Sequence, residues 1–435
     1  MSRLSSVPEQ LRGRIVGPDD ARYPLLRSTY TRSFQPAAVL LPESTEEVVA
    51  ALRFARDQGL AVAVRSGGHG LAGDSANNGG VVIDLSAMDR VELIDRASRL
   101  VRVEAGARWG TVARSLAPYG LAISSGDHGN VGVGGLTTGG GVGWLVRQYG
   151  LTIDHVRAVE LVLADGTTVR ADADHEPELF WAVRGAGAGL GIVVAFEIEA
   201  IELTDVGYAQ VVLEADRRGD TLRRWSEYLA TAPRELSTAM SVVPYGTGSA
   251  VVVQAVVASA DTGLIRAAVA PLLKIGVNLL EQRIQLAPYT ALVSTAHLHP
   301  NTGQQSVLTT NGLLPTLTAE TAGAVMAVAS GREQMLLQLR SVGGAVNDVA
   351  PDATAYAHRH QQALVVGTIF PAQRGAELDV AWQPLAGHLD GAYVNFESRP
   401  DPAAFARIYP GATGERVLAT RKRYDPDAVF RTRST

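Results

Sequence analysis

The chain has 435 residues, of which 46% are hydrophobic and 19% charged, and its formal net charge is −5. This length fits two or three domain-sized units, and the slightly acidic balance argues against a general nucleic-acid-binding protein. The complete lack of cysteine excludes disulfides, thiolate zinc sites, iron–sulfur clusters and a cysteine nucleophile. No run of about 18 apolar residues indicates a membrane span and the N-terminus has no apolar signal core, so we expect a cytoplasmic protein.

Residues 36 to 205 alternate between short strands and helices. A capping-box sequence beginning at Ser44 predicts the start of a helix with an apolar side, and Asp165-Gly166 predicts a hairpin turn. Further along this part we expect strands at 60–64, 81–85, 91–94, 100–105, 156–163, 168–171 and 192–201, and helices at 106–116 and 177–183.

After about residue 205 the glycine-rich segments end and the pattern changes. We expect strands at 209–213, 240–243 and 251–257, alternating with helices near 219–230, 262–274 and 317–330. This pattern predicts a second domain of the α+β class with an antiparallel sheet. In the C-terminal tail, a short strand is expected at 393–396 and a helix at 415–425.

Two glycine-rich segments carry the chemistry of the N-terminal part. The first, Arg65-Ser66-Gly67-Gly68-His69-Gly70, follows an apolar strand, and in the second nine of the eighteen residues from Gly126 to Gly143 are glycine. Backbone N–H groups in such segments form anion-binding concavities, so two of them suggest an extended ligand with a diphosphate. Neither segment matches a Walker A loop or a Rossmann fingerprint. The alternative is a glycine-rich connection without a ligand.

Several histidines and one tyrosine are candidates for function. His69 lies inside the first glycine segment, where a neutral imidazole would be a nucleophile able to capture a bound cofactor. The pairs His297-Leu298-His299 and His358-Arg359-His360 could bind zinc or copper, but no acid-rich segment accompanies them, and we expect no metal. Tyr393 and Asn395 would share one side of a strand. The phenolate of Tyr393 is a possible general base if its pKa is lowered; otherwise Tyr393 is a core residue.

Taken together, these segments resemble the berberine-bridge-enzyme-like flavoproteins of the vanillyl-alcohol oxidase superfamily, in particular bacterial members of the 6-hydroxynicotine oxidase type. The motifs cover most of the first 200 residues and the C-terminal tail. They are the segments 65–70, 126–135, 139–144, 149–154, 178–185, 191–193 and 423–426, together with Phe430.

The resemblance implies an α+β fold. A p-cresol-methylhydroxylase-type (PCMH-type) FAD-binding domain would comprise residues 1–205 and the returning tail 386–435, and residues 206–385 would form an inserted substrate domain on an antiparallel sheet. It also implies that FAD is bonded through its 8α-methyl group to His69. Cofactor contacts are implied for Arg65, Ser66, Gly67, Gly68, His69, Gly70, Ser125, Gly126, Asp127, Val131, Gly132, Gly135, Thr138, Gly139, Gly140, Gly141, Gly143, Trp144, Tyr149, Gly191, Ile192, Val193 and Asn395.

The chain departs from the family pattern at three places. Many relatives form a second flavin bond to a cysteine, and His128 occupies that position here, so a single covalent bond is expected. The usual Tyr-Gly-x-Asn-Tyr is replaced by the sequence from Tyr409 to Thr413, and Ser398 stands where an acid is common. The family suggests Tyr393 as general base, and His128, Tyr356 and His358 are further catalytic candidates.

The resemblance therefore predicts an FAD-dependent oxidase of secondary metabolism. Hydride would pass from a small or medium natural-product alcohol, amine or phenol to flavin N5, and O₂ would reoxidise the flavin to give H₂O₂. The composition of residues 206–385 suggests a largely apolar pocket. Two alternatives stay open, a redox-neutral flavin-dependent cyclase and a dehydrogenase with an acceptor other than oxygen. The oligomeric state is not predicted.

Overall fold

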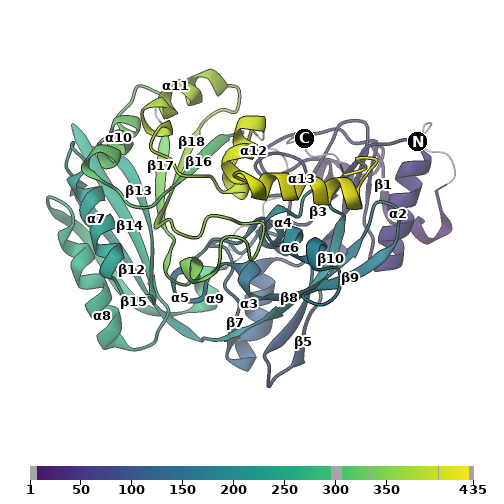
Figure 1. The fold of residues 1–435 in the computed structure, drawn as a ribbon, viewed down its shortest axis with the longest axis horizontal. Helices are drawn as coiled ribbons and strands as arrows, with labels where there is room; N and C mark the ends of the chain where they lie inside the picture. Colours follow the sequence, from purple (N-terminus) through teal and green to yellow (C-terminus); the bar gives the residue numbers. More distant parts are fainter. Residues whose placement is uncertain (1–6, 295–305, 334, 400, 431–435) are drawn as a thin grey trace.

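The computed structural model describes residues 7–294, 306–333, 335–399 and 401–430. Their strands form a four-stranded, a five-stranded, a two-stranded and a seven-stranded sheet (Figure 1). One large hydrophobic core joins the N-terminal sheets to parts of the C-terminal tail, and a second lies beneath the seven-stranded sheet. None of the described helices is long and apolar enough to cross a membrane.

One strand of the first sheet leads directly into the first glycine segment. Its order is β1 (Ile15–Val16), β2 (Ala38–Leu40), β4 (Val81–Asp84) and β3 (Val62–Arg65), with β2, β4 and β3 parallel. Helices α1 (Tyr23–Leu26) and α2 (Thr45–Asp57) belong to this part. The predicted start of α2 is confirmed, because the Ser44 hydroxyl accepts a hydrogen bond from the N–H of Glu47.

The second sheet is antiparallel. Its order is β5 (Val91–Asp95), β6 (Leu100–Glu104), β10 (Ile192–Glu199), β8 (Val156–Val162) and β9 (Thr168–Asp172). The short strands β7 (Leu121–Ala122) and β11 (Ile201–Glu202) pair with each other. The accompanying helices are α3 (Trp109–Leu116), α4 (Val133–Gly139), α5 (Val146–Tyr149) and α6 (Pro177–Ala186). Part of the second glycine segment is thus the helix α4, which the sequence did not suggest.

The seven-stranded sheet is antiparallel throughout. Its order is β15 (Leu279–Pro288), β12 (Asp205–Ala215), β14 (Gly248–Val257), β13 (Leu236–Tyr245), β17 (Leu336–Ser341), β18 (Ala363–Ile369) and β16 (Leu308–Leu314). Four of these strands, β15 to β18, were not predicted. The helices of this part are α7 (Asp220–Thr231), α8 (Thr262–Val269), α9 (Tyr289–Leu292), α10 (Ala319–Ala329) and α11 (Gly375–Ala386).

Side chains alternate between the two faces of this sheet. On β12, Val211 and Leu213 lie in the core shared with α7, α8, α10 and α11, so Tyr208 and Gln210 lie on the opposite face. That face is turned toward the second glycine segment. The division of the chain near residues 205 and 385 into separate domains stays a prediction.

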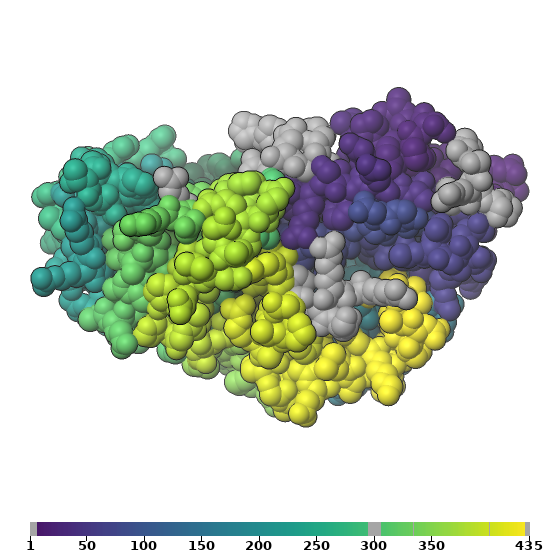
Figure 2. All heavy atoms as spheres, turned by 90° about the horizontal axis from the view of Figure 1, so that it is seen from above, coloured from purple at the N-terminus to yellow at the C-terminus, as the bar shows by residue number. Residues whose placement is uncertain are grey.

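The C-terminal segment returns to the N-terminal part, as Figure 2 shows in yellow. It contains α12 (Pro402–Ile408) and α13 (Ala412–Tyr424), the second of which confirms the predicted helix. Arg416 of α13 forms an ion pair with Glu178 of α6 at 2.7 Å, and the hydroxyl of Tyr409 donates to the carbonyl of Gly185.

The strand expected at 393–396 is wrong, because residues Val394–Phe396 form a short 3₁₀ helix. Its backbone is held by a side chain instead of a neighbouring strand. The N–H of Tyr393 donates to Asn311 Oδ1 at 2.7 Å, and Asn311 Nδ2 donates to the carbonyl of Tyr393 at 3.0 Å. An amide side chain can satisfy both backbone groups in this way, and the hydrophobic pattern of the sequence does not reveal it.

Candidate functional site

The two glycine segments interlock at Gly67 and Gly132. A Cβ atom at either position would overlap the backbone of the other. The guanidinium of Arg108 bridges the segments, because its Nη1 donates at 2.6 Å to the carbonyls of both Gly67 and Asn130. The Ser66 hydroxyl adds a third link by accepting from the N–H of Gly134 at 3.2 Å. Only glycine at Gly67 and Gly132 permits this approach.

A buried ion pair fixes the start of the first segment. Arg65, at the end of β3, is 2% exposed, and its Nε donates to Asp84 at 2.7 Å. Its Nη1 also donates to the carbonyl of Ser28 at 3.1 Å. Arg65 therefore uses its guanidinium to hold the protein backbone, and residues 66–70 leave the sheet in a defined direction.

His69 lies between two aromatic rings. It stacks on Tyr30 with ring centroids 4.7 Å apart and an interplanar angle of 14°, and its centroid is 5.6 Å from that of His128. Burial lowers the pKa of His69 to about 3, and the neighbouring Arg108 and His128 side chains act in the same direction. The imidazole is therefore neutral at physiological pH, which is the state that a nucleophile requires.

His128 is exposed. Its Nδ1 accepts a hydrogen bond from the N–H of Asn130 at 3.3 Å. In the neutral ring this contact places the proton on Nε2, so His128 presents a hydrogen-bond donor. Its geometry thus favours donation to a ligand over acceptance of a proton.

A cavity of about 550 Å³ extends from His128 to the seven-stranded sheet. Asp127 and Arg340, from opposite walls, form an ion pair at 2.5 Å. Polar and apolar groups line it in equal measure, so this cavity is less apolar than the composition suggested. The lining residues are Asp127, His128, Trp144, Tyr208, Gln254, Gln285, Ala287, Ala291, Leu292 and Arg340.

The strand-borne polar residues of this cavity were missed in the sequence. Tyr208, Gln254 and Arg340 each follow or precede apolar residues in their strands, which also carry other polar side chains. Alternation along β12, β14 and β17 places them on the face opposite the helix-covered core. Such polar interruptions on one face of an apolar sheet are the signal that could have found them.

Tyr393 lies behind the second glycine segment and is 2% exposed. Its hydroxyl oxygen accepts from the N–H of Gly141 at 2.9 Å and from Asn395 Nδ2 at 2.8 Å. Tyr393 and Asn395 are therefore close together, as predicted, although they do not lie on a strand. Burial raises the pKa of Tyr393 although both donors oppose this shift, so the structure does not show the lowered pKa that a phenolate base needs. The same contacts hold Gly141 in place.

Tyr356 and His358 continue the aromatic packing away from the cavity. The rings of Tyr356 and Tyr393 meet edge-on at 6.1 Å, and His358 meets Tyr356 edge-on at 5.6 Å. Burial raises the pKa of Tyr356 and lowers that of His358. His358 Nε2 is 3.0 Å from the carbonyl of Ile408, so both side chains contact the scaffold beneath the second glycine segment.

His358 and His360 have different partners and do not share a ligand geometry. His358 is buried against Ile408, whereas His360 forms an ion pair with Asp390 at the surface. His297 and His299 lie outside the described residues. Within the described part of the chain, no group of three or more His, Asp or Glu side chains is placed to hold a metal ion.

Several buried polar atoms near the glycine segments fit a ligand rich in hydrogen-bond acceptors. The hydroxyls of Thr31, Ser75 and Thr137 are buried and have no hydrogen-bond partner among the described residues. Thr31 follows Tyr30, whose N–H donates to the carbonyl of Gly68 at 2.9 Å, Ser75 lies five residues after Gly70, and Thr137 lies in α4 of the second segment. Unpaired buried hydroxyls are costly unless a ligand satisfies them, and phosphate oxygens would do so.

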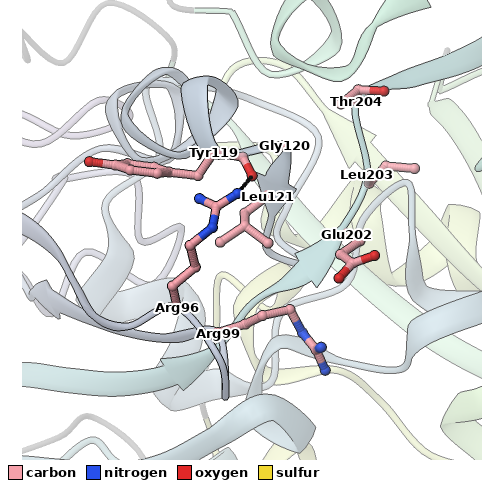
Figure 3. Close-up of a pocket in the computed structure, with 8 residues that line it drawn as sticks. All are labelled: Arg96, Arg99, Tyr119, Gly120, Leu121, Glu202, Leu203 and Thr204. Atoms are coloured by element: carbon pink, nitrogen blue, oxygen red, sulfur yellow. Dashed lines mark hydrogen bonds between the residues drawn. The ribbon is translucent and has the colours of Figure 1, made fainter.

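A second hollow, of about 460 Å³, lies at the β7–β11 end of the molecule (Figure 3). Arg96 donates to the carbonyl of Tyr119 at 3.5 Å there, and Glu202 and Arg99 lie on its other side. It contains none of the candidate catalytic or cofactor residues.

Comparison with known proteins supports the interpretation of the glycine segments as a cofactor-binding site. Residues 36–172 match the family model of an FAD binding domain. The chain is 30% identical to the FAD-linked oxidoreductase dpmaF of Metarhizium anisopliae, over 92% of this chain and 83% of that protein. It belongs to the berberine-bridge-enzyme-like family of FAD-linked oxidoreductases.

Solved structures of oxidases share the whole fold. The 6-hydroxy-D-nicotine oxidase from Arthrobacter nicotinovorans matches with a TM-score of 0.85 and 25% identity, over 99% of both chains. The glucooligosaccharide oxidase from Acremonium strictum matches with a TM-score of 0.84 and 24% identity, over 97% of this chain and 96% of that one. The predicted PCMH-type fold with an antiparallel sheet is confirmed, and the protein is an FAD-linked oxidoreductase.

The interlock makes Gly132 intolerant of any side chain. We expect Gly132→Ala to destabilise the protein by about 1–3 kcal/mol, because the added methyl group overlaps Ser66 and Gly67. The flavin-to-protein ratio should fall with it. Urea unfolding and flavin absorbance measure the two effects. Gly387→Ala, where a Cβ has open space, is the control, and equal behaviour of the two variants would contradict the interlock.

Proposed function

We propose that this protein is an FAD-dependent oxidase that takes hydride from a small-molecule substrate and returns the electrons to O₂ with formation of H₂O₂. One observation carries the proposal: the neutral imidazole of His69 and the donor ring of His128 lie together where the two glycine segments meet, beside a cavity. FAD bound there would supply hydride acceptance at N5. The chain's residues would hold the substrate in the cavity and accept its proton.

We further propose a single covalent link, between His69 and the 8α carbon of FAD. The glucooligosaccharide oxidase from Acremonium strictum carries a 6-S-cysteinyl, 8α-N1-histidyl FAD, and this chain keeps a histidine but has no cysteine. Formation of the link would break one C–H bond of the 8α-methyl group and the N–H bond of the imidazole and form one C–N bond. The two protons and two electrons released would reduce one O₂ to H₂O₂. The remaining cofactor contacts would come from residues 65–70, 125–144 and 191–193, with Tyr149 and Asn395.

Tyr393 remains our candidate for the proton acceptor. Two N–H donors at its oxygen favour the phenolate, which supports this role, whereas its burial opposes it. Tyr356 and His358, packed in sequence behind it, would fix the ring. Asp127 is a weaker candidate, because its carboxylate is already engaged by the guanidinium of Arg340.

Among the substrates considered, the cavity favours an alcohol. Its amide, phenol and guanidinium groups, from Gln254, Gln285, Tyr208 and Arg340, can donate to or accept from substrate hydroxyls. Trp144 offers an apolar surface for the rest of the molecule. Several relatives of the same fold are oligosaccharide oxidases, which supports a hydroxyl-bearing substrate.

The oxidase proposal is tested by screening alcohols for bleaching of the flavin without oxygen. For a substrate found in this way, we expect one O₂ consumed and one H₂O₂ formed per turnover, measured with an oxygen electrode and a peroxidase assay. Turnover without oxygen uptake would support the redox-neutral cyclase. Reduced flavin that persists for hours in air would support a dehydrogenase.

The covalent link predicts that flavin absorbance stays with the acid-precipitated protein. We expect His69→Ala to release all its flavin on precipitation, since no other residue in our proposal forms a bond to FAD. His128→Ala is the matched control on the neighbouring ring and should retain it. Retention by His69→Ala would overturn the assignment, and release by His128→Ala alone would move the link to that ring.

Because the pKa of His69 is low, we expect the rate of covalent FAD attachment to this residue to be independent of pH. An imidazole of ordinary pKa, about 6.5, would be roughly tenfold less available as the neutral form at pH 5.5 than at pH 8. With the pKa lowered to about 3, His69 stays neutral over this range. We expect the rate of attachment, measured by mixing saturating FAD with flavin-free protein, to be constant between these values. A drop with a midpoint near 6.5 would contradict the buried, neutral ring.

A further inference from the structure

Arg421, in α13, is a buried cation without a hydrogen-bond partner. The residue is 8% exposed, and its Nε and Nη1 atoms are buried and unpaired among the described residues. Its neighbours on the same helix differ from it. Arg416 forms an ion pair with Glu178, and the side chain of Arg423 is 65% exposed. No ion pair between described residues includes Arg421.

An unpaired buried guanidinium is energetically unfavourable. Arginine cannot lose its proton to escape the cost of burial, and the cost of an uncompensated buried charge is large. Burial lowers the pKa of Arg421, while Tyr409 and Asp74 act in the opposite direction. The nearest aromatic contact is the ring of Phe405, 5.8 Å from the guanidinium carbon. These groups do not supply the hydrogen-bond acceptors that Nε and Nη1 require, so an anion from outside the chain is indicated.

The position of Arg421 relates it to the first glycine segment. Asp74, whose charge acts on Arg421, lies five residues after His69. The next residue, Ser75, has a buried hydroxyl without a partner, and a Cβ at Gly70 would lie 3.9 Å from it. Helix α13 packs on α6, and α6 packs on α4. Arg421 and Ser75 are therefore unpaired polar groups that approach the glycine segments from two different parts of the chain.

We propose that Arg421 binds the diphosphate of FAD, with the Ser75 hydroxyl as an additional donor. The proposal rests on the flavin site proposed above and adds to it a residue from the returning C-terminal helix. The unused N–H groups of Nε and Nη1 lie on different sides of the guanidinium, so each could donate to a separate oxygen of a diphosphate. The site would then be closed by residues more than 300 positions apart in the chain, and FAD binding would tie α13 to the first glycine segment.

The test uses ADP and adenosine as probes in the His69→Ala protein, which lacks the proposed covalent link. We expect Arg421→Met to weaken ADP binding by at least about tenfold in titration calorimetry, because a charge-assisted contact to phosphate is lost. Adenosine, which has no phosphate, should bind both proteins equally. Arg423→Met is the matched control on the same helix and should leave both affinities unchanged.

A second measurement separates ligand binding from a structural role. In the ligand-free protein, Arg421→Met should raise the melting temperature, because it removes an uncompensated buried charge; an arginine that stabilises the fold would have the opposite effect. Unchanged ADP affinity in Arg421→Met, or equal loss for ADP and adenosine, overturns the proposal. Failure of the His69→Ala protein itself to bind ADP would instead overturn the proposed flavin site, and the role of Arg421 with it.

Discussion

The close approach of Gly67 and Gly132 is the constraint on which the site depends. It allows two segments separated by more than 60 residues to pack backbone against backbone. The Arg108 side chain links the two segments by donating to the carbonyls of Gly67 and Asn130. The rings of His69 and His128 are neighbours because the segments that carry them meet here. A side chain at either glycine would separate the two rings, so the chemistry of the site follows from the absence of two Cβ atoms.

A second set of contacts fixes the seven-stranded sheet over this point. Arg147, next to the second glycine segment, donates to the carbonyls of Leu229, Pro233 and Leu236 around the end of α7. Arg359 forms a buried bidentate pair with Asp154, and Arg340 reaches Asp127 across the cavity. Breaking a buried pair by removing one partner is costly, so these links hold the sheet in one position. The polar face of the sheet is thereby presented to His128.

The sequence predicted the parts of the site that depend on local patterns. Glycine clustering located both segments, and His69 and His128 stand where those segments place them. The cavity could not be predicted in this way, because Tyr208, Gln254 and Arg340 come from three strands whose neighbours are set by long-range pairing. The strand predicted for residues 393–396 is wrong for a related reason. Asn311, 82 residues away, satisfies the backbone N–H and carbonyl of Tyr393. Hydrophobic periodicity contains no information about such a partner.

In the flavin site that we propose, His128 would stand at one edge of the cofactor in place of a cysteine. A thiolate would form a bond, whereas His128, with Nδ1 engaged by Asn130, can offer a single N–H at Nε2. A hydrogen bond is reversible and its strength depends on the charge of its acceptor, so His128 can respond to the oxidation state of a neighbouring ring. Asp127 precedes it in the chain and is held by Arg340. The ion pair therefore ties the backbone segment that carries His128 to β17 of the seven-stranded sheet.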